Sequence, residues 1–399
     1  MFSKFMVLFS VLFFWGSCFA GLKPSQYRHI SLSKPKIKVR IGDKLKKVTI
    51  SGTDLKRTLH VNNNHKKFPG RKRIRFNCKS FTRKNKGKIS KPILLASVSS
   101  QTGLISLDRT KYQGRLHVVT SPSEESCDVI QEVDMDSYIS GLLSKEMNGA
   151  WPVEALKAQA VAARTYAFYK QTTQQVSRKL GHQAYYDLES SEKHQVAGDF
   201  FATTLNTDMA TTDTAGYVLV TKGKGNLTET FFHAKCGGKT LKPSSVWSNR
   251  VEGYSGVSCP FCDSHGKKNW KESISRARMV KFLKWAKRKG HIKFRDSLLK
   301  NKIRLAKDKF KANNLRIYLG SKVLVLKKPL LRRYFGRFSV SSNNYKMVSK
   351  GNDFRVYGKG LGHGVGMCQL GALDLADRGW DFKKILAHYF PGHKLVKLY

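Results

Sequence analysis

The pattern of apolar and polar residues changes several times along this chain of 399 residues. Its strongest helical signal is the alanine-rich segment 153–169, which also carries larger apolar side chains at intervals between Val153 and Phe168. Pro152 stands at the first helical position, where its fixed φ helps and its missing N–H costs nothing. Because alanine lets neighbouring backbone approach closely on several sides, we expect this helix to be buried at the centre of a domain.

Short apolar runs on both sides of this segment predict strands. Runs at 92–98, 112–119 and 128–134 are separated by Gly, Ser or Pro turns and predict an antiparallel meander. A short helix beginning at Met135 should lead from the meander to the alanine-rich helix. Beyond that helix, residues 211–220 and 229–233 have the pattern of a hairpin.

Two regions differ from this central part. Residues 21–92 are basic and weakly periodic, and they predict an extended N-terminal region with a few short strands, such as 34–41 and 73–76. Residues from about 271 to 345 combine basic helical stretches with two strands, and they predict a smaller inserted α+β subdomain. The fold class is therefore predicted to be α+β, with antiparallel sheet elements around the buried alanine-rich helix and the main domain over 93–399.

The N-terminus predicts export. Lys4, an apolar run over 5–14 and small residues at the −3 and −1 positions of Cys18-Phe-Ala20 indicate a signal peptide over 1–20. The apolar run is shorter than the ~20 residues of a membrane-spanning helix, and lipid attachment at Cys18 is the alternative. No other stretch is long and apolar enough to span a bilayer, so we expect a protein of the periplasm or cell envelope that is not an integral membrane protein.

The formal net charge is +47, from 74 Lys and Arg against 27 Asp and Glu. In a cytosolic protein such a charge indicates nucleic acid, whereas in an exported protein the anionic polymers of the envelope are better candidates. The positive residues are spread along the chain and do not concentrate in one recognition helix. We therefore expect general affinity for a polyanion, and not nucleic-acid binding.

Glu146 stands directly before the alanine-rich helix, in a stretch that contains Gly149. A carboxyl group there can act as a general acid and base if its pKa is raised toward neutrality, and Met147 and Trp151 are apolar neighbours suited to that. A helix N-terminus opposes this effect, because it favours the ionised form. The alternative is that Glu146 is an ordinary first-turn acid that complements the helix dipole. Glu154, just inside the helix, is the rival acid, and we interpret it as the residue that complements the dipole.

Beyond the signal peptide six of the 7 cysteines remain. Four of them have the spacing of a closed, structural tetrahedral zinc site: Cys236, Cys259, Cys262 and Cys368. His233 and His265 are alternative fourth ligands, and disulfides are the alternative chemistry in an oxidising compartment. Cys78 and Cys127 could pair separately.

Three separated stretches together indicate a family. They are 146–167, then 232–240 with Trp247, and finally the glycine-rich 358–372 followed by 385–392. In this order they resemble the stage II sporulation protein D family (SpoIID/LytB), whose members are exported proteins that act on peptidoglycan. The resemblance covers roughly residues 110–399.

This resemblance implies a lytic transglycosylase that cleaves glycan strands, preferentially peptide-stripped ones, to leave 1,6-anhydro-muramyl ends. Glu146 takes the position of the catalytic acid. One carboxylate suffices where the C6 hydroxyl of the sugar is the nucleophile, so we expect no second catalytic carboxylate and no cofactor in catalysis. The alternative is a wall-binding protein that enhances a separate amidase, since some members are named for that role.

Four further residues are candidates for substrate binding: Trp151, Arg164, His363 and Gln369. A charged Arg164 on a buried helix needs a partner, and a buried ion pair or a clamp on backbone carbonyls competes with substrate binding. The segment around His363 is too rich in glycine for a regular element and must be a tight loop. His363 could bind sugar hydroxyls, orient the acid, or only hold the loop.

Overall fold

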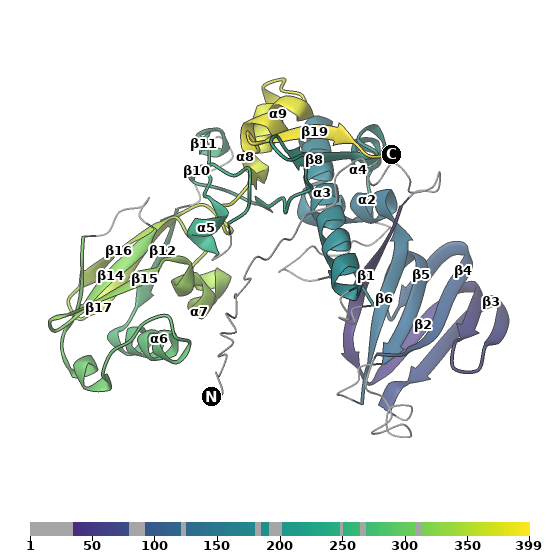
Figure 1. Ribbon diagram of the computed structural model, residues 1–399, viewed down its shortest axis with the longest axis horizontal. Helices are drawn as coiled ribbons and strands as arrows, with labels where there is room; N and C mark the ends of the chain where they lie inside the picture. Colours follow the sequence, from purple (N-terminus) through teal and green to yellow (C-terminus); the bar gives the residue numbers. More distant parts are fainter. Residues whose placement is uncertain are drawn as a thin grey trace, which may run out of the picture.

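A computed structural model describes residues 35–79, 92–120, 125–179, 185–190, 202–247, 250–263, 269–307 and 313–399. The expected signal peptide and His265 lie outside the described residues. A large sheet forms one end of the molecule and an α+β subdomain the other, and helices α8 and α9 lie between them (Figure 1). The α+β class is confirmed.

The large sheet has seven strands in the order β3-β2-β4-β5-β6-β1-β7. Their bounds are β1 Lys36–Leu45, β2 Lys47–Leu59, β3 Asn64–Asn77, β4 Leu94–Leu107, β5 Thr110–Thr120, β6 Cys127–Asp134 and β7 Leu188–Glu189. Only the short pairing of β1 with β7 is parallel. The predicted meander is confirmed, because β5 pairs antiparallel with both β4 and β6. Alternate side chains of β2, β4 and β5 form a core on one face of the sheet.

The strands expected at 34–41 and 73–76 overlap β1 and β3, but the expectation that the N-terminal region is extended with only a few short strands is wrong. Residues 36–77 form three long strands, and β2 pairs with β4 in the same sheet as the meander. The strand β3 lies at the sheet edge with almost all of its residues exposed, and Ile74 alone among them is buried. Its sequence therefore shows little of the alternation by which a half-buried strand is recognised.

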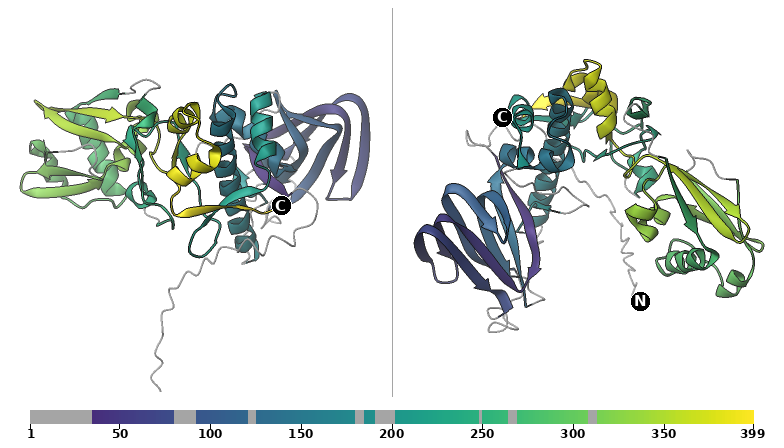
Figure 2. Two further views of the ribbon diagram at one scale, coloured as in Figure 1. Left: turned by 90° about the horizontal axis from the view of Figure 1, so that it is seen from above. Right: turned by 180° about the vertical axis from the view of Figure 1, so that it is seen from behind.

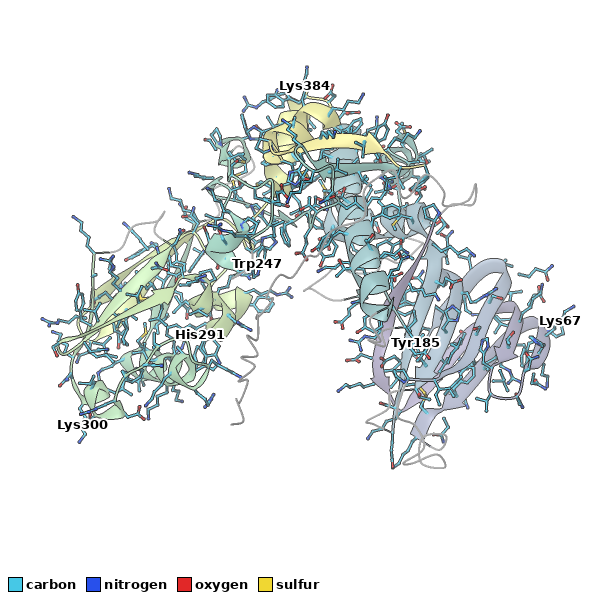
Figure 3. All side chains as sticks on the ribbon, viewed as in Figure 1. Lys67, Tyr185, Trp247, His291, Lys300 and Lys384 are labelled. Carbon is cyan, nitrogen blue, oxygen red and sulfur yellow. A yellow bond between two sulfur atoms is a disulfide. The ribbon has the colours of Figure 1, made fainter. Side chains whose placement is uncertain are left out.

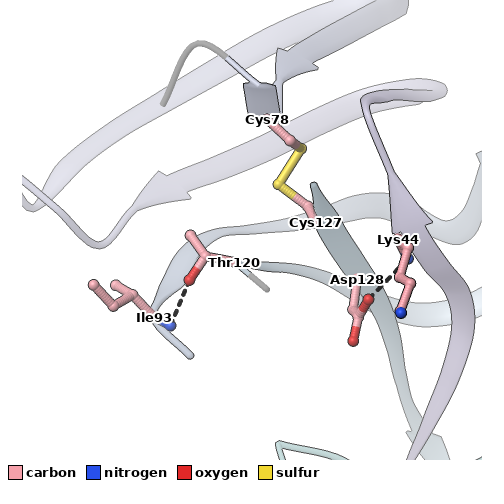
Figure 4. The surroundings of a disulfide bond; sticks show 6 residues. All are labelled: Lys44, Cys78, Ile93, Thr120, Cys127 and Asp128. Carbon is pink, nitrogen blue, oxygen red and sulfur yellow. Dashed lines mark hydrogen bonds between the residues drawn. A yellow bond between two sulfur atoms is a disulfide. The ribbon is translucent and has the colours of Figure 1, made fainter. Parts of the chain in front are cut away.

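A disulfide joins the end of β3 to the start of β6 (Figure 4). It links Cys78 to Cys127, so the predicted separate pairing of these two cysteines is confirmed. Near this bond the Thr120 hydroxyl accepts the Ile93 N–H at 2.8 Å (Figure 4). The disulfide thus links β3 to β6, two strands that β2, β4 and β5 separate in the order of the sheet.

Helices α2 (Met135–Glu146) and α3 (Val153–Lys179) contact the sheet, and α4 (Leu205–Asp213) packs on both helices. Asp134 caps α2 by accepting the Ser137 N–H at 2.9 Å. The helix α3 lies between the large sheet and the C-terminal helices α8 and α9 in both further views (Figure 2). One group of its fully buried residues, including Leu156 and Ala160, packs with α2, and another, including Val161, packs with α8 and α9. Small side chains let α3 contact two cores at once.

The predicted hairpin of residues 211–220 with 229–233 is wrong. Residues 211–213 belong to α4, and β8 (Tyr217–Thr221) pairs antiparallel with the C-terminal β19 (His393–Lys397). The strand β9 (Phe232–His233) pairs parallel with β18 (Met367–Cys368). Both partners lie more than 130 positions away in the sequence, so local alternation could not reveal them.

The segment between β9 and the subdomain consists of short elements. These are β10 Gly238–Lys239, α5 Pro243–Val246, β11 Ser258–Cys259 and the 3-10 helix η3 Phe261–Asp263. After the subdomain the chain returns and forms α8 Gln369–Asp377 and α9 Phe382–Tyr389. Together with α3 these elements enclose the third core, which contains the four remaining cysteines.

The inserted subdomain has its own core and two three-stranded sheets, β12-β17-β16 and β13-β14-β15. Its elements are β12 Asn269–Ile274, α6 Arg276–Arg288, η4 Asp296–Lys300, β13 Ile303–Leu305, β14 Asn314–Leu319, β15 Lys322–Lys327, α7 Pro329–Ser339, β16 Tyr345–Lys350 and β17 Asp353–Lys359. It extends beyond the expected 345, because the entering strand β12 pairs with the leaving strand β17. Among the described helices of the whole chain, none is long and apolar enough to cross a membrane.

Candidate active site

Glu146 is the last residue of α2, and its side chain is half-buried. We expected it in a loop at the N-terminal end of the alanine-rich helix, so this placement is a correction. The Met147 N–H closes the last turn of α2 by donating to the Leu143 carbonyl at 2.9 Å. A helix C-terminus carries partial negative charge, which disfavours an ionised carboxylate beside it. The electrostatic argument that opposed an acid role at this position is therefore reversed.

The loop from Met147 to α3 is held in place at several points. The Asn148 side chain accepts the Ala150 N–H at 3.0 Å, and the Thr204 hydroxyl donates to the Gly149 carbonyl at 3.0 Å. A Cβ on Gly149 would lie 2.7 Å from Thr204, so this close approach requires glycine. Trp151 is half-buried and packs against the core that α2 and α3 share. The loop therefore supports Glu146 from a fixed position.

Tyr138 also belongs to α2, and its side chain is buried in the core. The charge of Glu146 influences the pKa of Tyr138. Burial raises the pKa of Tyr138 well above its usual value, and the charges of Tyr166 and Glu146 act in the same direction. Tyr138 consequently remains a neutral phenol near the carboxyl group at any physiological pH.

The third motif meets the first at Glu146. Gln369 begins α8, and its side-chain amide donates to the Glu146 backbone carbonyl at 3.2 Å. Gln369 is buried, which leaves its side chain little surface for a ligand. In this structure Gln369 supports the backbone of Glu146, although we had grouped it with substrate-binding residues.

His363 lies in a cluster of aromatic rings from the second and third motifs. The Trp247 ring centre is 5.1 Å from that of His363 and 4.7 Å from that of Phe231, and His233 is 5.6 Å from His363. His363 Nδ1 accepts the Val365 N–H at 3.1 Å, which stabilises the glycine-rich loop. Burial lowers the pKa of His363 to about 3, with a further contribution from His233. His363 is therefore neutral near pH 7, and because Nδ1 already accepts, the ring proton lies on Nε2.

Trp247 is the exposed member of this cluster. It lies between the two ends of the molecule (Figure 3), and 36% of it is exposed. An exposed indole over neutral rings is a suitable surface for the apolar face of a sugar. The sequence motif included Trp247, but its contact with His363 depends on tertiary structure.

Asn343 is a neighbour of His363 that sequence reasoning missed. Its side chain donates to the His363 backbone carbonyl at 3.0 Å from just before β16 of the inserted subdomain. An asparagine in a polar loop carries no local signal of such a contact.

Arg164 lies fully buried within α3, with 0% of it exposed. Its guanidinium is 3.0 Å from Asp136 Oδ1 and donates to the Thr214 carbonyl at 2.8 Å and the Thr211 carbonyl at 3.3 Å. This is the ion pair and carbonyl clamp that we had set beside substrate binding. A side chain without exposed atoms offers no surface to a glycan, so the substrate-binding interpretation of Arg164 is wrong for this conformation.

The four remaining cysteines converge. Their Sγ atoms all lie within 4.8 Å of one another, and all four residues are buried: Cys236, Cys259, Cys262 and Cys368. Zinc with Zn–S bonds of ~2.3 Å places its sulfurs about 3.8 Å apart, so the set fits a tetrahedral ion. Backbone N–H groups point at two of the sulfurs, from Cys236 to Cys368 Sγ at 3.3 Å and from Gly238 to Cys236 Sγ at 3.4 Å. Such donors favour the thiolate form that a metal requires.

The alternatives to this ligand set are less well supported. The four cysteines are free thiols, so no disulfide joins any two of them. His233 uses Nδ1 in a 3.0 Å hydrogen bond with the Val365 carbonyl, and its ring contacts His363. Four sulfur ligands already complete a tetrahedron without it.

Comparison with known proteins gives a consistent result. A sequence model described as stage II sporulation protein (SpoIID) matches residues 123–220. An uncharacterized protein of Brachyspira hyodysenteriae is 31% identical over 290 residues, 73% of this chain and 73% of that protein. The amidase enhancer of Bacillus subtilis is 26% identical over 342 residues, 74% of this chain but 46% of that protein. The stage II sporulation protein D of Bacillus amyloliquefaciens is 24% identical over 275 residues, 66% of this chain and 74% of that protein.

Proposed function

Because the chain belongs to the stage II sporulation protein D family and its first and third motifs meet at Glu146, we propose that it is a peptidoglycan lytic transglycosylase. The names of its relatives, a sporulation protein and an amidase enhancer, support a role at the cell wall. The signal-peptide pattern over 1–20 supports export to the periplasm or cell envelope. Its substrate would be the glycan strand, with peptide-stripped strands preferred.

One observation carries the proposal of catalysis. The Gln369 side-chain amide donates to the Glu146 backbone carbonyl at 3.2 Å, so the glycine-rich motif and helix α2 together fix the backbone that carries this carboxyl group. Its place at the end of α2 favours the protonated form that a general acid needs.

The reaction needs only this group and the substrate. Glu146 donates its proton to the glycosidic oxygen as the bond from that oxygen to C1 of the muramyl residue breaks. The C6 hydroxyl oxygen of the same sugar then bonds to C1, and Glu146 takes the hydroxyl proton. The carboxyl group is thereby restored, no water is consumed, and a 1,6-anhydro ring forms. The C6 hydroxyl is already tethered to the reacting sugar, so its attack has the entropic advantage of an intramolecular step.

Zinc would have a structural role in this proposal. Cys236, Cys259, Cys262 and Cys368 would hold it and so join the segment after β9, β11, η3 and β18. The ion would fix the segment that follows His233 and the start of α8, which carries Gln369, and would supply no reacting group.

The proposal is tested by digesting purified, peptide-free glycan strands and measuring 1,6-anhydro-muramyl ends by mass spectrometry. Wild type should produce them, and Glu146→Gln should lower the rate by about 10²–10⁴-fold. Glu154→Gln is the matched control, because Glu154 is a nearby acid that accepts the Phe382 N–H at 2.7 Å and has no assigned chemistry. Wild type that binds strands but forms no anhydro ends would refute the enzyme, as would a Glu154→Gln variant that alone abolishes them.

A second function is favoured by the relative named amidase enhancer. In that case the chain would bind the wall and stimulate a separate amidase without cleaving glycan. Adding wild type or Glu146→Gln to a cell-wall amidase separates the two functions. Equal stimulation by both proteins, with no anhydro ends, would establish the enhancer.

A further inference from the structure

The phenol of Tyr389 points at a cysteine sulfur in the third core. Tyr389 is the last residue of α9, and its Oη is 3.1 Å from Sγ of Cys259, which ends β11. Tyr389 is 2% exposed and Cys259 is 0% exposed. Within the described ranges the Tyr389 hydroxyl has no other hydrogen-bond partner. A buried phenol therefore depends on a sulfur atom for its hydrogen bond.

The strength of this bond depends on whether Cys259 is a thiol or a thiolate. A neutral thiol is a weak donor and a weak acceptor, so it compensates poorly for the burial of a hydroxyl group. A thiolate carries no hydrogen, so the phenol must then be the donor, and hydrogen bonds to ionised acceptors are about twice as strong as neutral ones. The buried phenol thus suits Cys259 as a thiolate, which is the form in which cysteine binds a metal ion.

Cys259 differs from two other sulfurs of the set in the origin of its donor. Cys368 Sγ accepts the Cys236 N–H at 3.3 Å and Cys236 Sγ accepts the Gly238 N–H at 3.4 Å, so these two donors are backbone groups of one loop. The donor to Cys259 is a side chain from a helix 130 positions away in the sequence. One substitution can therefore remove this donor without changing a metal ligand.

Gly371 leaves the space that this contact needs. It lies in α8, and a Cβ built on it would be 2.1 Å from Tyr389 Oη and 2.8 Å from Cys259 Sγ. Atoms in a packed core do not approach so closely, so any larger residue at this position would displace the phenol and the sulfur. Glycine is unfavourable within a helix, and the contact between Tyr389 and Cys259 explains why α8 contains one here.

We propose that Tyr389 supports the metal site from outside its four sulfur ligands, by donating its hydroxyl hydrogen to the Cys259 thiolate. Four thiolates exceed the two positive charges of a zinc ion, so the loaded site would carry net negative charge inside the core. The Tyr389 hydroxyl would stabilise part of that charge and join α9 to β11. The inference rests on the zinc site within the proposed function and goes beyond it, but it does not depend on the cleavage of glycan.

The zinc affinity of the full chain tests this role. Tyr389→Phe keeps the ring and removes only the hydroxyl group. Competition with a chromophoric chelator should show zinc binding about 10–100-fold weaker than in the wild type. Tyr345→Phe is the matched control, because it removes a phenol that is also fully buried and donates to the Lys328 carbonyl at 2.9 Å, but in the core of the inserted subdomain. The zinc affinity of this control should equal that of the wild type.

Cobalt(II) in place of zinc gives a readout that loosened packing alone would not produce. It absorbs visible light through its d–d transitions and through charge transfer from sulfur to cobalt. Loss of a hydrogen bond raises the energy of the sulfur electrons, so the charge-transfer band of Tyr389→Phe should move to longer wavelength, while its d–d bands stay those of a tetrahedral ion. Gly371→Ala is a second variant, expected to give the same shift because its methyl group displaces the phenol. Either variant that folds decides the inference.

Two results would overturn the proposal. One is a Tyr389→Phe protein with the zinc affinity of the wild type and an unshifted band. The other is an equal loss of affinity in Tyr345→Phe, which would assign the effect to general packing.

The failure of this inference and that of the proposed enzyme give different results. A wild type that binds zinc through Tyr389-dependent affinity but forms no anhydro ends would refute only the enzyme. Anhydro ends formed by a wild type that holds no metal, or whose zinc affinity does not depend on Tyr389, would refute only this inference.

Discussion

Replacing Arg164 with methionine should strongly destabilise the packing of α3, although we assign Arg164 no catalytic role. The Arg164 guanidinium is fully buried and joins α3 to Asp136 of α2 at 3.0 Å and to the Thr214 carbonyl after α4 at 2.8 Å. Methionine keeps much of the side-chain volume but provides no hydrogen-bond donor. The Asp136 carboxylate and the carbonyls at the end of α4 then lose their donors inside the protein.

Removing one partner from a buried ion pair costs about 3–5 kcal/mol. The Asp136 side chain is 13% exposed and keeps the Tyr399 hydroxyl as a donor at 2.9 Å, so part of its charge remains solvated or hydrogen-bonded. We therefore expect a loss near the lower end, about 3 kcal/mol, in the free energy of opening α3.

Hydrogen exchange of α3 amides is the suitable assay, because a chain with several cores does not unfold in one step. A loss of 3 kcal/mol should speed the exchange of these amides about a hundredfold. Arg278→Met is the control: its pair with Glu272 has a distance of 2.8 Å, but 42% of the Arg278 side chain is exposed. Such a pair contributes about 0–1 kcal/mol. Equal effects of the two substitutions on their own helices would refute the reasoning about burial.

Three further predictions test other parts of the structure. Gly366→Ala should lower the melting temperature more than Gly351→Ala: both have positive φ, at 74° and 60°, but only at Gly366 would a Cβ meet a backbone oxygen, that of Phe231 at 1.9 Å. Equal shifts would contradict this. Burial lowers the pKa of His393 from 6.5 to about 4, so its contribution to stability is complete above pH 6.5 and falls by up to about 3 kcal/mol as the pH drops to 4. His393→Leu should flatten that dependence in the hydrogen exchange of β8 and β19 amides, corrected for intrinsic exchange rates, and an unchanged slope would exclude it. Metal analysis should find one zinc ion per chain in the wild type. Cys262→Ser should lose this ion and should unfold at a lower temperature. A wild-type protein with no metal and four titratable thiols would exclude the zinc site.

Predictions from the sequence succeeded where neighbouring residues determine the structure. The helix after Pro152 and the meander that ends at Asp134 rest on local propensity, capping and turns, and the structure contains both. The spacing of the cysteines also marked the set that converges, because Cys259 and Cys262 lie three positions apart and are close in any fold. The family motifs single out Glu146 as the candidate catalytic acid, and that role stays a prediction.

The tertiary structure decided what depends on distant partners. The pairing of β8 with β19 joins a segment from the middle of the chain to its C-terminal strand, and no local pattern records such a choice. Burial of Arg164 depends on Asp136 and Thr214, which makes it a clamp and not a ligand for sugar. Glu146 belongs to the helix before it and not to the one after it, and this difference reverses the sign of the helix dipole at its carboxyl group. The sequence by itself determined which residues could carry the chemistry, whereas long-range packing set their charge environment and their neighbours, because burial and electrostatics act through space and not along the chain.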